Sequence, residues 1–101
     1  MEARFSEPTV LILVSLAAGP KHGYALIKDI EEIAGATLGP GTLYGALSRL
    51  EQQGLVEALP TADRRRPYQI TPAGTELVRR YLEHTRKVAT LGLRRLAAAH
   101  A

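Results

Sequence analysis

Glycine and proline residues divide this chain into segments whose lengths decide what it can form. They interrupt the first 72 of the 101 residues at short intervals, at Gly19-Pro20, Gly35, Pro40, Gly54, Pro60, Pro67 and Pro72. Proline cannot continue a helix, and glycine commonly follows the last helical turn. The chain before Pro72 is therefore restricted to short elements, whereas the stretch after it can form one extended helix.

Apolar periodicity predicts three helices in the first part, over residues 8–18, 23–34 and 40–53. The first is apolar on nearly all sides, which is typical of a buried central helix, and Ser6 is the candidate for its N-cap. The third carries its apolar side chains on a single face, at Leu43, Leu47 and Leu50. Only a short turn separates the second helix from the third.

Two short strands are expected next, over residues 55–59 and 68–70, and the loop between them holds Arg64, Arg65 and Arg66. Thr71-Pro72 then reads as an N-cap followed by a first helical residue. The last helix is expected over residues 72–98. The fold class that follows is mainly α with a small β-hairpin: a winged helix-turn-helix domain over residues 1–71 and a long C-terminal helix over residues 72–101.

The outer face of the third helix indicates what the fold does. Away from the leucine stripe it carries small or hydrogen-bonding side chains, at Thr42, Gly45, Ser48, Arg49 and Gln52. The major groove of DNA admits one helix, and the side chains that meet base edges there are of these types. The three loop arginines are expected to contact phosphates or the minor groove; the alternative is a solvated turn.

Charge is divided unevenly along the chain. Residues 1–60 carry four basic and seven acidic residues, a net charge of −3, whereas residues 61–101 carry nine basic and three acidic residues, a net charge of +6. A basic second half favours a polyanionic partner, although a solvated basic surface looks the same in sequence.

Other function classes find little support. The chain has no cysteine, and His22, His84 and His100 are too scattered for a metal site. Ser15 has no paired base, no glycine-rich phosphate loop exists, and the apolar run at 10–18 is too short to span a bilayer. We therefore expect a cytoplasmic DNA-binding protein, not an enzyme, with no cofactor, metal or membrane contact.

Several segments together resemble the PadR family of bacterial transcription regulators. They are His22-Gly-Tyr24, Pro40-Gly-Thr-Leu-Tyr44, Leu47-Ser-Arg-Leu-Glu51 with Gly54-Leu-Val56, and Arg64-Arg-Arg66 with Tyr68-Gln-Ile-Thr71. Their order and spacing match over residues 8–75. The total length is similar to that of the short subfamily, in which one C-terminal helix serves as the dimerisation element.

The resemblance implies a dimeric winged-helix repressor on a roughly palindromic operator. By position, the DNA contacts it implies are Thr42, Tyr44, Ser48, Arg49, Arg64, Arg65 and Arg66. The Tyr44 ring has an alternative place, packed beneath the second helix. Gly45 departs from the family, which often has a larger residue there, and the loop lacks the usual glycines.

The entrance of the second helix offers one more candidate, because free N–H groups at a helix N-terminus attract phosphate. Lys21 is the expected phosphate contact there. His22 is expected to fix the turn, and Tyr24 to fill the core.

The apolar stripe of the last helix is wider than the rest of the chain can cover, so an identical chain is the expected partner. The dimerisation residues are then Leu77, Tyr81, His84, Val88 and Leu91. A second hypothesis is a ligand-sensing or protein-interaction module that acts through the dimer cleft, with a small aromatic effector against Ile12, Tyr24, Tyr81 and Val88.

Overall fold

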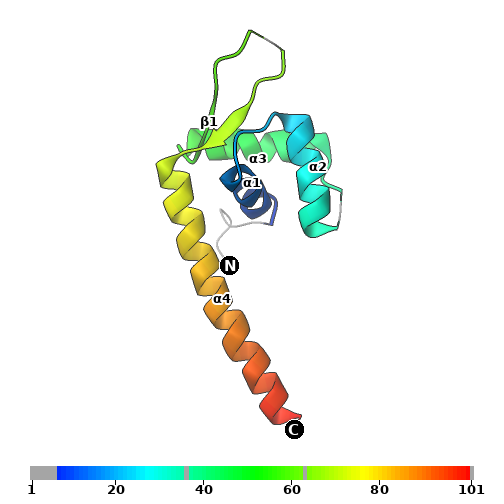
Figure 1. Cartoon of the computed structure of the whole chain (residues 1–101), viewed down its shortest axis with the longest axis vertical. Coiled ribbons are helices and arrows are strands. Elements are labelled where there is room, and N and C mark those ends of the chain that lie inside the picture. Colours follow the sequence, from blue (N-terminus) through cyan, green and yellow to red (C-terminus); the bar gives the residue numbers. More distant parts are fainter. Residues whose placement is uncertain (1–6, 36, 63, 101) are drawn as a thin grey trace.

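The computed structural model describes residues 7–35, 37–62 and 64–100. Its elements follow one another as α1 (Glu7–Ala17), α2 (Gly23–Ala34), α3 (Pro40–Gln52), β1 (Val56–Ala58), β2 (Tyr68–Ile70) and α4 (Pro72–Ala99) (Figure 1). The predicted order of helices and hairpin is confirmed. The main difference is a shorter first strand. Ser6, the expected cap of α1, lies outside the described residues.

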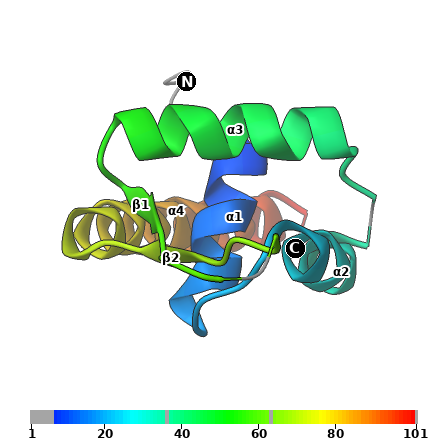
Figure 2. The ribbon, with the colours of Figure 1, turned by 90° about the horizontal axis from the view of Figure 1, so that it is seen from above.

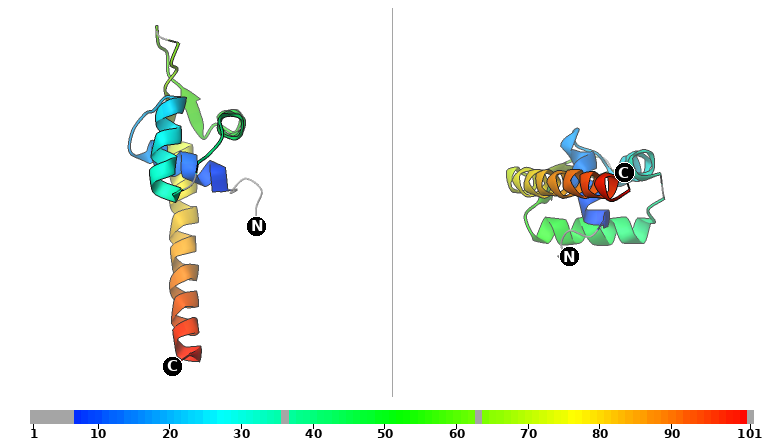
Figure 3. Two further views of the ribbon diagram at one scale, coloured as in Figure 1. Left: turned by 90° about the vertical axis from the view of Figure 1, so that its right-hand side faces the viewer. Right: turned by 90° about the horizontal axis from the view of Figure 1, so that it is seen from below.

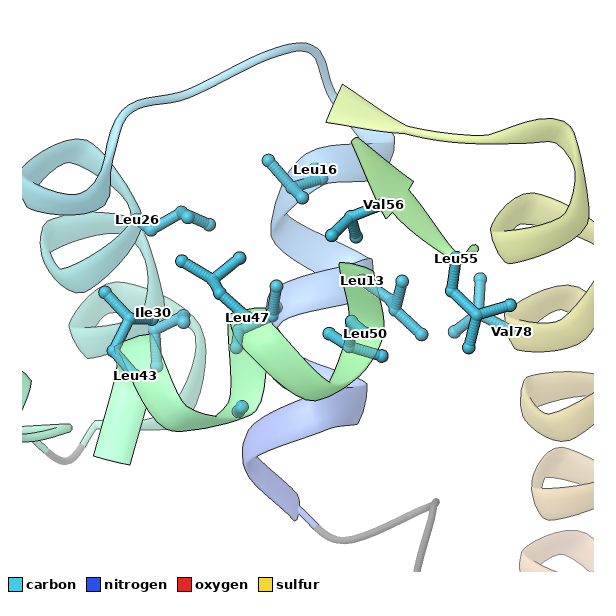
Figure 4. Close-up of a cluster of buried hydrophobic side chains, with 12 residues drawn as sticks. Leu13, Leu16, Leu26, Ile30, Leu43, Leu47, Leu50, Leu55, Val56 and Val78 are labelled. Carbon is cyan, nitrogen blue, oxygen red and sulfur yellow. The ribbon is translucent and has the colours of Figure 1, made fainter. Parts of the chain in front are cut away.

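The core forms where α1 is enclosed by the other elements, as seen from above in Figure 2. Helix α1 contributes Ile12, Leu13 and Leu16, all buried, which explains why its sequence is apolar on every side. Around them lie buried side chains of α2, α3, β1 and the start of α4, namely Leu26, Ile30, Leu43, Ala46, Leu47, Leu50, Leu55, Val56 and Val78 (Figure 4).

Side-chain hydrogen bonds cap the N-termini of α2 and α4. His22 Nδ1 accepts a hydrogen bond from the Ala25 amide at 3.4 Å, so His22 is the N-cap of α2. Thr71 caps α4 through Oγ1, which accepts from the Gly74 amide at 3.1 Å and donates to the Gly54 carbonyl at 2.7 Å. The predictions that His22 fixes the turn before α2 and that Thr71 is the N-cap of the last helix are confirmed.

The hairpin is small, and a third segment extends it. Strands β1 and β2 pair antiparallel, with Val56 opposite Ile70. On the far side of β2, the Lys21 amide donates to the Tyr68 carbonyl at 3.0 Å, and the Tyr68 amide donates to the Lys21 carbonyl at 2.9 Å. The loop between the strands rises above the helices as a wing (Figure 1).

Helix α4 leaves the core after its first two turns. Gly74 and Val78 are its buried residues among those described, and a Cβ at position 74 would overlap the Leu55 carbonyl oxygen. Beyond Val78 the helix projects as a rod, which gives the molecule a length of 59 Å against widths of 26 and 22 Å (Figure 3).

Candidate nucleic-acid interface

Helix α3 separates an apolar face from a polar one. Leu43, Leu47 and Leu50 are at most 1% exposed and hold the helix against α1 and α2. The polar residues predicted to meet DNA all lie on the exposed side, at Thr42, Tyr44, Ser48 and Arg49. Figure 2 shows this helix along one edge of the molecule, with its outer side uncovered by other elements. The face is therefore open to a partner.

Gly45 leaves space on that face for the Arg49 guanidinium. A Cβ built at position 45 would lie 3.7 Å from Arg49 Nη1, with no other atom within 4 Å apart from the neighbouring and helical backbone. The guanidinium thus lies beside residue 45, one turn earlier on the helix. At 3.7 Å such a Cβ would make an ordinary van der Waals contact, so an alanine would also fit beside the arginine at this departure from the family pattern.

The wing places its three arginines near α3. Arg64, Arg65 and Arg66 are all exposed, and Arg64 and Arg66 border two surface hollows. One hollow, of about 650 Å³, lies between the wing and the N-terminus of α2. The other, of about 580 Å³, lies between the wing and Glu51 near the end of α3. The wing arginines therefore share these hollows with α3 at Tyr44 and at Glu51.

The larger hollow also gathers aromatic side chains from distant parts of the chain. Tyr24 of α2, Tyr44 of α3 and Tyr68 of β2 line it together with the wing arginines. Tyr44 is 48% exposed, and its hydroxyl packs on Gly23 at the start of α2, close to the packed alternative considered for its ring. Any Cβ at position 23 would overlap that hydroxyl. Gly23 therefore makes room for Tyr44.

Tyr68 is protonated in this setting. Burial raises the pKa of its phenol above the ordinary value, and the Glu51 carboxylate acts in the same direction, while Arg66 opposes them. The neutral phenol can donate a hydrogen bond to an anion. Sequence reasoning missed Tyr68 and Glu51 as residues of this surface; the signal for Tyr68 was its position directly after the Arg-Arg-Arg-Pro run.

Two residues at the entrance of α2 differ from expectation. Tyr24, expected in the core, is 65% exposed, because the buried face of α2 runs along Gly23, Leu26 and Ile30 and position 24 lies off that face. Lys21, expected at a phosphate, directs its ammonium into the protein, where it donates to the Ser15 carbonyl at 2.5 Å and lies 3.9 Å from Asp29 Oδ2. That ammonium already has partners.

The predicted dimerisation residues follow α4 from the core outward. Leu77 packs partly against the core, and Tyr81 is half-buried. His84, Val88 and Leu91 are exposed, as are the neighbouring Leu82, Leu93 and Leu96. The four residues proposed to line an effector site do not come together in the single chain, since Ile12 is enclosed in the core and Tyr24 borders the wing.

Over the described ranges, no group of three or more His, Cys, Asp or Glu side chains is placed to hold a metal ion. No helix in those ranges has the length and apolar character needed to cross a membrane.

The fold and the polar face define a winged helix-turn-helix protein. A model of the transcriptional regulator PadR-like family matches residues 12–80. Because this is more than half of the chain, the protein belongs to the PadR-like family of transcriptional regulators, and hence to a class of regulators and not of enzymes.

Two curated relatives are similar over most of this chain. A 37.1 kDa uncharacterised protein in transposon Tn4556 of Streptomyces fradiae is 51% identical over 77 residues, which are 76% of this chain and 22% of that protein. The transcriptional activator GvpE2 of Halobacterium salinarum is 30% identical over 71 residues, which are 70% of this chain and 36% of GvpE2. The chain therefore spans about a fifth and about a third of their lengths.

Solved structures match over nearly the whole length. RosR of Halobacterium salinarum is 28% identical with a TM-score of 0.74, over 96% of this chain and 99% of that one. A PadR family transcription regulator from Clostridium difficile is 23% identical with a TM-score of 0.78, over 85% of this chain and 94% of that one, a likeness that shows the fold.

Proposed function

We propose that this chain binds double-stranded DNA as a homodimer and represses transcription from a roughly palindromic operator. The observation that carries the proposal is the placement of the arginine wing beside the polar face of α3. Thr42, Ser48 and Arg49 are exposed, on the side of α3 that the other described elements leave uncovered. An exposed helix with such side chains fits the major groove, where base edges present donors and acceptors.

The wing and its larger hollow supply the phosphate contacts in this proposal. Arg64, Arg65 and Arg66 provide charge, and the Tyr44 and Tyr68 hydroxyls provide hydrogen-bond donors beside them. Contacts of this kind fix the position of a protein on the duplex, while base contacts from the helix select the sequence. We therefore assign affinity mainly to the wing and sequence preference to Ser48 and Arg49.

Dimerisation is proposed to occur along α4. Its exposed apolar side chains extend the stripe that begins at Leu77. Val88, for example, is 56% exposed. An identical chain covers such a stripe with a closed two-fold arrangement. We assign residues 1–71 to DNA binding and residues 72–101 to dimerisation, the first two turns of α4 being shared with the core. Two recognition helices about 34–36 Å apart then match successive major grooves.

The proposal is tested by replacing Arg64, Arg65 and Arg66 together with alanine. Each phosphate neutralised contributes about −0.9 to the slope of log affinity against log salt concentration. Because a dimer carries two wings and hence six of these arginines, we expect the triple variant to bind all duplexes at least ~10-fold more weakly at low salt and to lose up to about 5 from the magnitude of that slope. Fluorescence anisotropy with labelled DNA at several salt concentrations measures both.

A matched control removes the same charge elsewhere. Arg86, Arg94 and Arg95 on the exposed part of α4 are changed together to alanine, with the dimer checked by sedimentation. Affinity and slope should stay near the wild-type values. An unchanged slope in the wing variant, or equal losses in both, would show that the wing does not hold phosphate.

The finer parts of the proposal have their own measurements. Transcription from a template carrying the operator distinguishes repression from activation, the role named for the relative GvpE2.

Release by a small aromatic effector is tested by thermal shift and by loss of DNA binding. A regulator of bacterial promoters works in the cytoplasm, which fractionation checks.

A further inference from the structure

Lys21 joins three elements of the fold at one residue. Its ammonium donates to the carbonyl of Ser15, in the last turn of α1, at 2.5 Å, and lies 3.9 Å from the carboxylate of Asp29 on α2. Its backbone forms two hydrogen bonds with Tyr68 at the start of β2. The side chain is therefore fixed to the helices while the main chain is fixed to the wing.

The contacts around the ammonium form a connected, partly buried cluster. Asp29 Oδ2 also accepts a hydrogen bond from Ser15 Oγ at 2.5 Å, and Ser15 is 1% exposed. The Ser15 carbonyl belongs to the negative end of α1, which favours a cation. The side chains of Lys21 and Asp29 are 20% and 31% exposed, so solvent screens their attraction less than that of a surface pair.

The backbone side of Lys21 leads directly to the wing. Tyr68 lines the hollow that holds Arg64, Arg65 and Arg66, and only Pro67 separates it from the last of these arginines. A shift of residue 21 relative to α1 and α2 would therefore move the return strand of the wing. The angle between the wing and α3 depends on this connection, because α2 and α3 share one core.

We propose that Lys21 is a positioning residue that sets the wing relative to the recognition helix and itself contacts no phosphate. The proposal rests on the DNA-binding function proposed above. It replaces the local expectation that a lysine at a helix entrance holds phosphate. Its contribution to DNA binding is geometric, so loss of the ammonium lowers affinity without changing the number of counterions released.

The test is Lys21→Met, which keeps an unbranched apolar stem and removes the ammonium. Hydrogen exchange of the Tyr68 amide in the free protein reports the anchoring, and DNA anisotropy over a range of salt concentrations reports its consequence. We expect exchange at Tyr68 to accelerate and affinity to fall about 3- to 10-fold at every salt concentration, with an unchanged slope. A direct phosphate contact would instead lower the magnitude of the slope by about 2, because each dimer carries two copies of Lys21.

Lys28→Met is the matched control, because Lys28 is an exposed lysine on the same helix as Asp29 and loses the same charge. It should leave exchange at Tyr68 unchanged. Asp29→Asn is a milder second variant that keeps Lys21 and weakens only its charge partner; it should give smaller changes in the same direction, and it decides the matter if Lys21→Met fails to fold.

The outcomes separate the two proposals. Wild-type protein that binds no DNA at low salt contradicts the proposed function, while the exchange data still decide whether Lys21 anchors the wing. If DNA binds and both exchange and affinity are unchanged in Lys21→Met, Lys21 does not position the wing. A slope reduced in magnitude by about 2 with unchanged exchange assigns Lys21 to phosphate and overturns the proposal.

Discussion

Helices α3 and α4 show the same apolar periodicity in sequence, but the chain buries the apolar face of α3 and leaves most of that of α4 exposed. Each has an apolar stripe at helical spacing and polar residues elsewhere. In α3 the leucines are sealed inside the chain, and the polar side faces outward. In α4 the apolar side chains beyond Tyr81 remain exposed, up to 69% at Leu93. An apolar stripe thus predicts that a helix has one apolar face. Whether the same chain buries that face depends on how the other elements pack around it.

The largest effect is expected from breaking the buried side of this comparison. Leu47→Ala removes a side chain that is 1% exposed, and such truncations lower the free energy of unfolding by about 2–5 kcal/mol. Urea denaturation at fixed protein concentration measures it. Ser48→Ala, the next residue on the exposed side, should change the free energy by less than about 0.5 kcal/mol. Equal losses would mean that the outer face of α3 is packed.

The exposed stripe of α4 is tested by placing charges in it. Val88→Glu with Leu91→Glu should weaken the dimer about 100-fold or more, because burying unpaired carboxylates is costly. Sedimentation equilibrium gives the dissociation constant, and far-UV circular dichroism checks the helix. Thr90→Glu places a charge on another face of the same turn and should leave the dimer intact. A dimer that tolerates the double change would refute association through this stripe.

The smallest effect concerns a single carboxylate on each helix. Glu51 lines a hollow with Arg64 and Arg66, where it would oppose a DNA phosphate. Glu51→Gln should raise affinity for DNA about 2- to 3-fold, in line with the small energies of exposed charges. The same change at Glu83, exposed on α4, should have no effect in the same anisotropy assay. Equal gains would indicate a general effect of net charge and not of position.

Glu51→Gln has a second readout. Because the Glu51 carboxylate helps to raise the pKa of the Tyr68 phenol, its removal should let that phenol ionise at a lower pH. The ultraviolet titration of Glu51→Gln, compared with that of a variant that also carries Tyr68→Phe, isolates this group.

The local parts of the structure could be predicted from sequence. Helix α2 and strand β2 begin and end where breakers and apolar spacing placed them, and the leucine face of α3 is the buried one. These features depend on residues within a few positions of one another. The exposed set at Thr42, Ser48 and Arg49 follows from the same periodicity, because a helix with one buried face must expose the other.

Contacts between distant segments could not be predicted in this way. Tyr24 was expected in the core, yet it is exposed and lines a hollow with Tyr44, Tyr68 and the wing arginines, which come from distant parts of the chain. Lys21 stands where local rules favour phosphate, but Ser15, Asp29 and Tyr68 engage it from three elements. Such partners depend on how the elements pack, which no local pattern contains.

The close contact between Gly74 and the Leu55 carbonyl fixes how the base of α4 packs on the rest of the domain. The Leu55 carbonyl touches the helix backbone there, where any larger residue would force the two apart. Helix α4 has 28 residues and is therefore about 42 Å long, so a tilt of about 5° at its base displaces its tip by about 4 Å. In the proposed dimer, the lack of a side chain at Gly74, near the base of α4, would thus help to set the distance between the two winged helix-turn-helix domains.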